Sequence, residues 1–343
     1  MPFEPKPPAT GPVATQWIIS RRDDSVWFIG SALVGYLALA LLAAGFPPIP
    51  LMLIWLLGVD GPHVLATVTR TYFDRVERAK LGPTLWIPVP LLLLGPLAVA
   101  VGQGSVFFLF AVCWQHFHVV KQHFGFVMLY KAKNRERDQH DFFLDRWFLL
   151  TSLFVPLGLF VLRTRPGLTQ LAPLDWVASA AVAVYAVLTL AWLWRQVEKF
   201  RAGSAMNWPK LALLACVVPL QWLALLHASQ HGPDGIVRAG ITLGLFHSIQ
   251  YHRLLWFHNR NRYAQPEGRA KYGLAAKTAS HVLVYFGIAA GLYLLLVFLP
   301  QLVFPGEMAA ASVWGFSFAH FILDAKIWRV RSDRDLAVAL RLA

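Results

Sequence analysis

Long apolar segments recur along this chain and limit what it can fold into. An apolar stretch of about 20 residues can cross the hydrocarbon core of a bilayer as an α-helix. Hydrophobic residues make up 57% of the chain and charged residues only 14%, a composition typical of polytopic membrane proteins. We therefore expect an all-α transmembrane bundle of about ten spanning helices. The expected spans lie approximately at 26–45, 49–69, 84–102, 105–130, 147–162, 174–195, 209–227, 236–258, 278–299 and 309–328.

The expected spans take up most of the 343 residues and leave little room for a separate soluble domain. No linker and no repeat of fixed period divides the sequence. We expect a single integral-membrane domain over residues 1–343. Residues 1–20 begin with a polar, Pro-rich stretch and are expected to form a disordered lead-in.

Basic residues follow a pattern that orients the expected bundle. They gather at the amino terminus and after every even-numbered span, in the segments 21–22, 70–80, 131–146, 195–201, 260–277 and 326–341. Lys and Arg are enriched in cytoplasmic loops, so both termini are expected in the cytoplasm, with a bacterial inner membrane as the compartment and membrane lipids as surroundings. The net charge of +13 is explained by this asymmetry. Because no basic stripe interleaved with stacking aromatic residues is present, no nucleic-acid partner is expected.

Histidines lie inside several of these apolar segments. An imidazole in hydrocarbon is costly unless it is paired, hydrogen-bonded or coordinated, so intramembrane histidines are candidates for function. Four of them, His63, His123, His252 and His320, lie six to eight positions before the basic residue that begins the next basic segment, and His118 and His247 lie about one and a half turns deeper. This spacing places them in one slab, roughly 10 Å inside the cytoplasmic boundary. The proposed ligand pool is His63, His118, His123, His247, His252 and His320.

Spacing along each helix indicates which side chains can share a centre. His320 and Asp324 are four positions apart and project together, so Asp324 can be a ligand, a base or the partner that fixes the imidazole tautomer. Tyr251 shares a helix face with His247, and both Asp324 and Tyr251 are candidate catalytic groups. His247 and His252 point about 140° apart on a regular helix. They can flank one centre only if the helix is distorted or if two metal ions bind.

The other histidines have simpler interpretations. His140 lies in a charged loop and is expected to be solvated, and His258 ends a span where headgroup contact is expected. Membership of the site is left open for four more histidines. His116 also suits a core histidine, His227 and His231 lie at the opposite boundary, and His281 enters from the basic side.

The ligand types narrow the choice of metal. Neutral imidazoles with a carboxylate, and no thiolate arrangement, suit iron, copper or zinc. Open-sided His/carboxylate sites are typical of non-haem iron oxygen chemistry, so one or two iron ions are the preferred cofactor. Two facing histidines also suffice as axial ligands of a haem, although more than two at similar depth favour a non-haem site.

Four short motifs together resemble, distantly, the bacterial Brp/Blh family of membrane-bound β-carotene 15,15′-dioxygenases. They are Gly61-Pro62-His63, His123-Phe124-Gly125 with the adjoining His116 and His118, His247-Ser248 to His252, and His320 to Asp324. The resemblance implies a multi-helix membrane fold with histidine-bound iron that activates O₂ to cleave or oxidise an apolar polyene. The chain departs from the family pattern at three places. One extra residue precedes the second histidine of the His-Ser motif, Val64-Leu65-Ala66-Thr67 replaces an expected acid, and Ala319 replaces a proline.

The sequence therefore predicts a membrane-embedded, histidine-ligated non-haem iron oxygenase or oxidoreductase. Its expected partners are O₂ and a hydrophobic or amphipathic substrate, carotenoid-like in the narrowest interpretation, that enters from the bilayer. The metal site is expected toward the cytoplasmic side. Two alternatives remain open: a metal or proton transporter that uses intramembrane histidines, and a haem-binding electron carrier.

Overall fold

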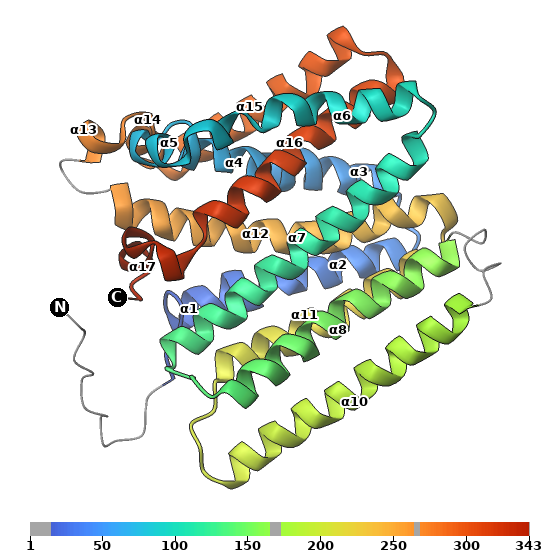
Figure 1. The fold of residues 1–343 in the computed structure, drawn as a ribbon, viewed down its shortest axis with the longest axis vertical. Coiled ribbons are helices and arrows are strands. Elements are labelled where there is room, and N and C mark those ends of the chain that lie inside the picture. Colours follow the sequence, from blue (N-terminus) through green and yellow to red (C-terminus); the bar gives the residue numbers. More distant parts are fainter. Residues whose placement is uncertain (1–14, 165–172, 264–267, 343) are drawn as a thin grey trace.

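Long helices that run side by side form the body of the protein (Figure 1). The computed structural model describes residues 15–164, 173–263 and 268–342. Within these ranges the secondary structure is helical, apart from one isolated antiparallel bridge between Asp74 and Gly273. The all-α prediction is confirmed for the described residues.

The bundle contains interrupted rods, single long helices and short connecting helices. The first three rods are each built from consecutive segments: α1 (Arg21–Asp23), η1 (Asp24–Ile29) and α2 (Ser31–Ala43); α3 (Pro48–Leu53), η2 (Ile54–Asp60) and α4 (Gly61–Thr71); α5 (Arg75–Leu81), η3 (Gly82–Trp86) and α6 (Pro88–Ala100). The single long helices are α7 (Gly104–Lys133), α8 (Gln139–Thr164), α10 (Pro173–Arg201), α11 (Trp208–Ala228), α12 (Gly235–Tyr263), α15 (Val282–Val303) and α16 (Gly306–Ile327). Short helices complete the chain: η4 (Gly232–Asp234), α13 (Gly268–Tyr272), α14 (Leu274–Thr278), η5 (Val330–Ser332) and α17 (Arg334–Ala339).

Every range expected to span coincides with one of these rods or long helices. Eight of them are long and apolar enough to cross a membrane, which indicates an integral membrane protein. The helices α7 and α12 have 30 and 29 residues but are not among the eight. The expected total of about ten crossings stays a prediction.

The reason that α7 and α12 are less apolar is that they carry most of the buried histidines. His116, His118 and His123 lie on α7, and His247 and His252 lie on α12, all of them buried. Figure 1 shows α12 in the middle of the helix array, between α4 and α2. The buried histidines on these helices therefore face other helices.

The apolar core consists of separate clusters, two of which include residues of α7, the helix that carries three of the buried histidines. The main cluster joins α2, α7, α8, α11 and α12, and includes Phe126, Leu149 and Phe246. A smaller cluster on the other side of α7 is made mainly of aromatic rings from α7 and α16, among them Phe107 and Phe318. Helix α10 lies at the edge of the array, where it packs against α8.

Close contact between α6 and α16 depends on two glycines. A Cβ atom at Gly95 would lie 2.3 Å from the carbonyl oxygen of Ala311, and one at Gly315 would lie 2.6 Å from that of Leu91. The Ser312 hydroxyl donates to the carbonyl of Leu92 over 3.0 Å at the same contact. Because α16 carries His320 and Asp324, this packing positions part of the candidate site.

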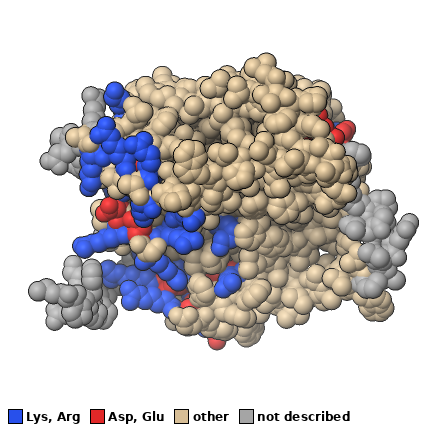
Figure 2. All heavy atoms as spheres, turned by 45° about the horizontal axis from the view of Figure 1, so that its top comes forward, with Lys and Arg blue, Asp and Glu red and all other residues tan. Residues whose placement is uncertain are grey.

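Basic side chains gather at one end of the molecule (Figure 2). The helices α1 and α17 also lie at that end, so the first and last described helices are on the same side (Figure 1). Basic residues at the end that holds α1 and α17 are the basis for predicting cytoplasmic termini, and that orientation stays a prediction.

Part of the expected lead-in, residues 15–20, is described by the structure. Residues 1–14 lie outside the described residues. Ile18 is buried, and its backbone N–H donates to the Asp24 carboxylate over 2.7 Å. The Gln16 backbone N–H donates to the Asn134 side chain over 2.9 Å. Residues 15–20 are therefore packed against the bundle, because Ile18 is apolar and Asp24 accepts from their backbone.

Candidate metal centre

Three histidine side chains from three helices meet inside the bundle. Nε2 of His63 on α4 lies 2.8 Å from Nε2 of His320 on α16. Nε2 of His118 on α7 lies 3.2 Å from the same His320 atom. One ring nitrogen from each of the three lies within 4.8 Å of the other two, and all three side chains are buried. The sequence prediction that distant histidines converge is confirmed for these three.

A local feature of the backbone precedes His63. Pro62 has no N–H, so it cannot make the usual helical hydrogen bond to the residue four positions earlier. The turns before it, over η2, are wider than an α-helix, and the Gly61 N–H donates to the carbonyl of Leu56, five residues back. Such wide turns accommodate irregular residues within a helix and are frequent at functional sites. The rod continues as α4 with His63 in its first turn.

The tautomer of His320 follows from its contact with Thr67. The Thr67 hydroxyl lies 2.6 Å from Nδ1 of His320 and 3.0 Å from Oδ1 of Asp324. An ionised carboxylate can only accept, so the single hydroxyl proton of Thr67 goes to Asp324. The proton of the other contact must then come from Nδ1 of His320. Nε2 of His320 consequently carries a lone pair that faces His63 and His118.

Asp324 accepts a second hydrogen bond at the same oxygen. The Tyr251 hydroxyl donates to Oδ1 of Asp324 over 2.9 Å, and it lies 3.1 Å from the Thr67 hydroxyl. The Tyr251 ring is stacked on the His63 ring, with centroids 4.2 Å apart and planes 12° apart. Tyr251 therefore contacts two elements of the site, the imidazole on α4 and the carboxylate on α16.

His247 lies beside the three converging histidines. Its ring centroid is 4.8 Å from that of His63 and 5.3 Å from that of His118. Its Nδ1 atom is buried and has no hydrogen-bond partner among the described residues, as is also true of Nδ1 of His63. A buried nitrogen without a partner is costly, so Nδ1 of His247 is available to a further ligand.

The separations of the Nε2 atoms fit a shared metal ion. Imidazole nitrogens bind transition-metal ions at about 2.1 Å, so two neighbouring ligands are about 3.0 Å apart at a right angle and about 3.4 Å apart at the tetrahedral angle. The observed values of 2.8 and 3.2 Å are close to that range. Three imidazoles would leave coordination positions open for further ligands.

The structure separates two members of the expected ligand pool from this point. Both ring nitrogens of His252 have other partners, the Tyr285 hydroxyl at 2.8 Å and the Val59 carbonyl at 2.9 Å. His123 donates from Nδ1 to the Val119 carbonyl on its own helix over 2.8 Å, and its Nε2 has no partner in the described part of the chain. Neither belongs to the group of three.

His116 is held in the core away from the three. It contacts the Leu153 carbonyl on α8 at 2.9 Å and the Gln221 side chain on α11 at 3.1 Å. It is therefore a core histidine with partners of its own, which is one of the two interpretations that the sequence left open.

The remaining histidines lie at the helix ends. His227 and His231 are neighbours, with ring centroids 4.5 Å apart, and His281 caps the amino end of α15 through the Leu283 N–H. His140 is exposed, as expected. His258 was expected at the headgroups but is fully buried beside Trp328. The reason is that the C-terminal segment after α16 covers this end of α12.

Sequence reasoning missed two polar residues near the centre. Thr67 lies four positions after His63, so a search for polar side chains on the same helix face would have found it. Arg70 is buried, stacks over the Trp328 ring at 4.1 Å and donates to the Ile327 carbonyl over 2.6 Å. Its position seven residues after His63 is the signal that was available, but it was interpreted only as a boundary charge.

Comparisons of the chain with protein-family models, with curated proteins and with solved structures find no match. What the protein does must therefore be argued from its own site.

Proposed function

We propose that the chain is an integral membrane metalloenzyme that oxidises a hydrophobic substrate with O₂ at a non-haem iron held by His63, His118 and His320. The observation that carries the proposal is the meeting of three Nε2 atoms from α4, α7 and α16 in a buried site. His247 is the nearest further candidate ligand, since its ring contacts two of the three. A bound iron ion supplies Lewis-acid and redox chemistry toward O₂.

The neighbouring polar residues orient the histidine ligands and fix the position of their protons. Thr67 and Asp324 keep the proton of His320 on Nδ1, so that Nε2 is free to bind. Tyr251 covers one face of His63 and excludes water there, while its hydroxyl holds a proton against Asp324. Asp324 and Tyr251 are therefore assigned to orienting the ligands and holding a proton. Direct metal contact by Asp324 is not part of the proposal, because its nearer oxygen lies 3.7 Å from Nδ1 of His320, on the far side of the ring from Nε2.

The surroundings favour an apolar substrate. The His118 ring is stacked on Phe321 at 4.5 Å, and Trp114 is stacked on Phe318 at 4.6 Å. These rings join the buried aromatic cluster between α7 and α16. An apolar lining binds hydrocarbon and offers nothing to a polar solute. A carotenoid-like polyene, as the resemblance to the Brp/Blh dioxygenases implies, is the narrowest form of the proposal.

A haem fits this geometry less well. Two axial imidazoles lie on opposite faces of the macrocycle, with their coordinating nitrogens roughly 4 Å apart. Here the Nε2 atoms of His63 and His320 are 2.8 Å apart, and His118 approaches the same point. The plane of a haem cannot pass between these nitrogen atoms, so we prefer a metal ion without a macrocycle.

The test is metal analysis of the purified full-length protein, with an optical spectrum and an assay of O₂ consumption with an apolar polyene. We expect near-stoichiometric iron without a Soret band in the wild type and loss of that iron in His320→Ala. The matched control is His116→Ala, a buried histidine with partners outside the centre, which should keep the metal. Zinc or copper in place of iron would contradict the iron assignment. A protein that binds no metal and moves ions across vesicles would overturn the enzyme in favour of transport.

A further inference from the structure

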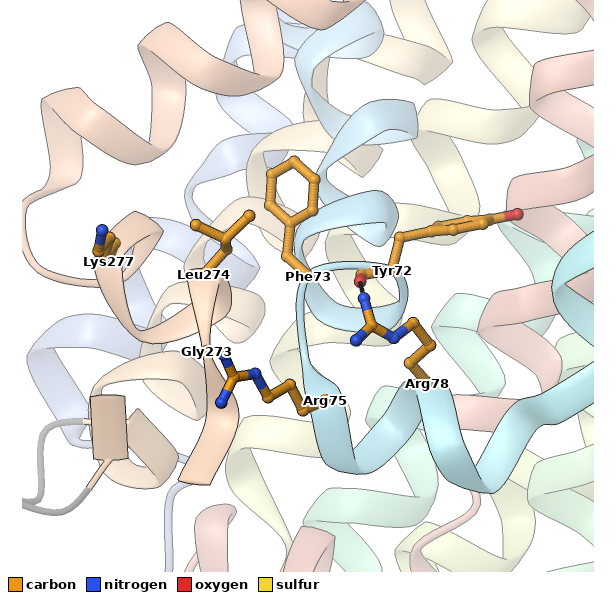
Figure 3. Close-up of a pocket in the computed structure, with 7 residues that line it drawn as sticks. All are labelled: Tyr72, Phe73, Arg75, Arg78, Gly273, Leu274 and Lys277. Carbon is orange, nitrogen blue, oxygen red and sulfur yellow. Dashed lines mark hydrogen bonds between the residues drawn. The ribbon is translucent and has the colours of Figure 1, made fainter. Parts of the chain in front are cut away.

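A cavity lies at the basic end of the molecule, outside the group of His63, His118 and His320. It has a volume of about 280 Å³ and lies between the segment that leads into α5 and the segment around α14 (Figure 3). In Figure 3, one wall carries Tyr72, Phe73, Arg75 and Arg78, and the facing wall carries Gly273, Leu274 and Lys277. The backbones of the two walls are joined, because the Ala275 N–H donates to the Phe73 carbonyl over 3.2 Å.

The three cations that line the cavity have no acidic partner among the described residues. Arg75 and Arg78 donate only to backbone carbonyls, at 3.4 and 3.3 Å, and Lys277 forms no ion pair there. These are long hydrogen bonds, which leave most of each charge uncompensated.

The acids closest in sequence face elsewhere. The Asp74 carboxylate accepts from Tyr263 over 2.9 Å and from Arg262 over 3.3 Å, and Glu77 accepts from Arg262 over 3.1 Å. Both acidic side chains are buried on that side. Among the described residues, the wall of the cavity is therefore positively charged, although acidic residues alternate with its arginines along the chain.

The cavity lies at the ends of candidate membrane spans. One span ends at Thr71, the next begins at Arg75, and a third begins at Val282, shortly after Lys277. Side chains at these positions are at the level of lipid headgroups. Phe73 and Leu274 add apolar surface beside the three charges. Positive charge, apolar surface and headgroup depth occur together at this point.

We propose that this cavity binds the phosphate group of an anionic membrane phospholipid, with Arg75, Arg78 and Lys277 around the phosphate and Phe73 and Leu274 against its glycerol and acyl portion. Guanidinium groups bind phosphate oxygens through paired, charge-assisted hydrogen bonds. Basic pockets between helices on the cytoplasmic side are typical sites for such headgroups. The bound lipid would brace the end of α4, the helix that carries His63 and Thr67.

The experiment compares full-length proteins reconstituted in phosphatidylcholine vesicles with and without phosphatidylglycerol, and measures the apparent Tm and the lipid retained after purification. The test variant combines Arg75→Gln, Arg78→Gln and Lys277→Gln. The control variant removes the same charge outside the cavity, from three exposed residues near the same end, by Lys326→Gln, Arg329→Gln and Arg331→Gln. Each basic group near an anionic headgroup contributes about fivefold to binding, so the test variant should lose affinity on the order of 100-fold.

We expect phosphatidylglycerol to raise the Tm of the wild type and of the control variant, and to leave that of the test variant unchanged. An equal rise in all three proteins would overturn the proposal, because it would show a general charge effect. A separate arm adds inorganic phosphate in detergent without lipid. If phosphate alone gives the full rise in Tm, the assignment to a lipid is wrong. If the triple test variant fails to fold, the single Lys277→Gln variant takes its place in the comparison of Tm with and without phosphatidylglycerol, because Lys277 is exposed.

Discussion

His63 and His320 are 257 positions apart in the sequence, and their Nε2 atoms lie 2.8 Å apart in the structure. Two imidazole nitrogens at this distance must share a proton or a cation, because two lone pairs facing each other in a dry interior repel. His320 already donates its own proton to Thr67 from Nδ1. His63 and His118 therefore hold the protons directed at Nε2 of His320, and a metal ion bound there would require each of these protons to move to Nδ1 of its own ring.

Substitutions of the expected ligand pool should divide into two groups. His63→Ala and His118→Ala are expected to lose the metal, because each removes one of the converging nitrogens. His252→Ala is expected to retain it, because both nitrogens of His252 bind Tyr285 and Val59. Metal content per protein, measured on the purified variants, gives the comparison. Loss of metal in His252→Ala with an unchanged Tm would mean that the His252 ring turns toward the centre on binding.

Thr67→Val should weaken metal binding without unfolding the protein. Valine has nearly the shape of threonine but no hydroxyl, so His320 loses the acceptor for its Nδ1 proton and Asp324 loses a donor. Loss of such an orienting partner typically lowers metal affinity 10- to 100-fold. Competition with a chelator measures the change.

Two further variants of α4 control that experiment. Thr67→Ser keeps the hydroxyl and should restore binding. Thr71→Val removes a buried hydroxyl that donates only to the Thr67 carbonyl of the same helix, and should leave affinity unchanged. Equal affinities in Thr67→Val and wild type would refute the role assigned to Thr67.

The helical fold could be predicted because apolar length is a local property. Each expected span coincides with a helix, since an apolar run of about 20 residues has few alternatives in a bilayer. The expected lead-in included Ile18, whose backbone is held by Asp24, a contact that a polar, Pro-rich composition does not reveal. Helix position follows from composition, whereas caps and loop contacts depend on particular partners.

The candidate site could be predicted only in part. Depth indicated that histidines from several helices share a slab, and His63, His118 and His320 do meet. Depth does not determine the direction in which a ring points, and His252 lies in the slab but faces Tyr285. The spacing of Thr67 from His63 places both on one helix face, but its role depends on Asp324 from a distant segment, a contact that the sequence does not reveal.

Gly95→Ala should destabilise the contact between α6 and α16. The new methyl group would lie 2.3 Å from the Ala311 carbonyl oxygen, and backbone atoms cannot turn aside as a side chain can. Overpacking of this kind costs about 1–3 kcal/mol. Gly291→Ala on α15 is the matched control, because a methyl group there meets nothing within 4 Å. We expect a lower apparent Tm, and weaker metal retention through α16, in Gly95→Ala only; equal Tm values would show that the two helices can separate at little cost.

A buried charge cluster at the basic end should make stability depend on pH. Glu136, in the loop between α7 and α8, accepts from Lys199 over 2.6 Å and from Lys210 over 3.0 Å, and Lys131 lies 3.6 Å away. Burial alone would raise the pKa of Glu136, but the charge of Lys210, the hydrogen bond from Lys199 and the charge of Lys131 outweigh it and lower the pKa from 4.5 to about 2. The cluster therefore favours the ionised carboxylate.

Because the folded pKa of Glu136 is below the unfolded value, its contribution is complete above about pH 4.5 and is lost as the pH falls toward 2. Its size is on the order of 2 kcal/mol after allowance for partial solvent screening. Glu136→Gln should lower the apparent Tm at pH 7 and flatten the fall in Tm between pH 5 and about 3. Glu198→Gln removes an exposed carboxylate that pairs with Arg195 over 2.7 Å, and should change the Tm little at any pH. If the two variants have the same Tm profile, the buried lysines do not depend on Glu136, and the Asp141 and Asp145 carboxylates must hold α8, α10 and α11 together without it.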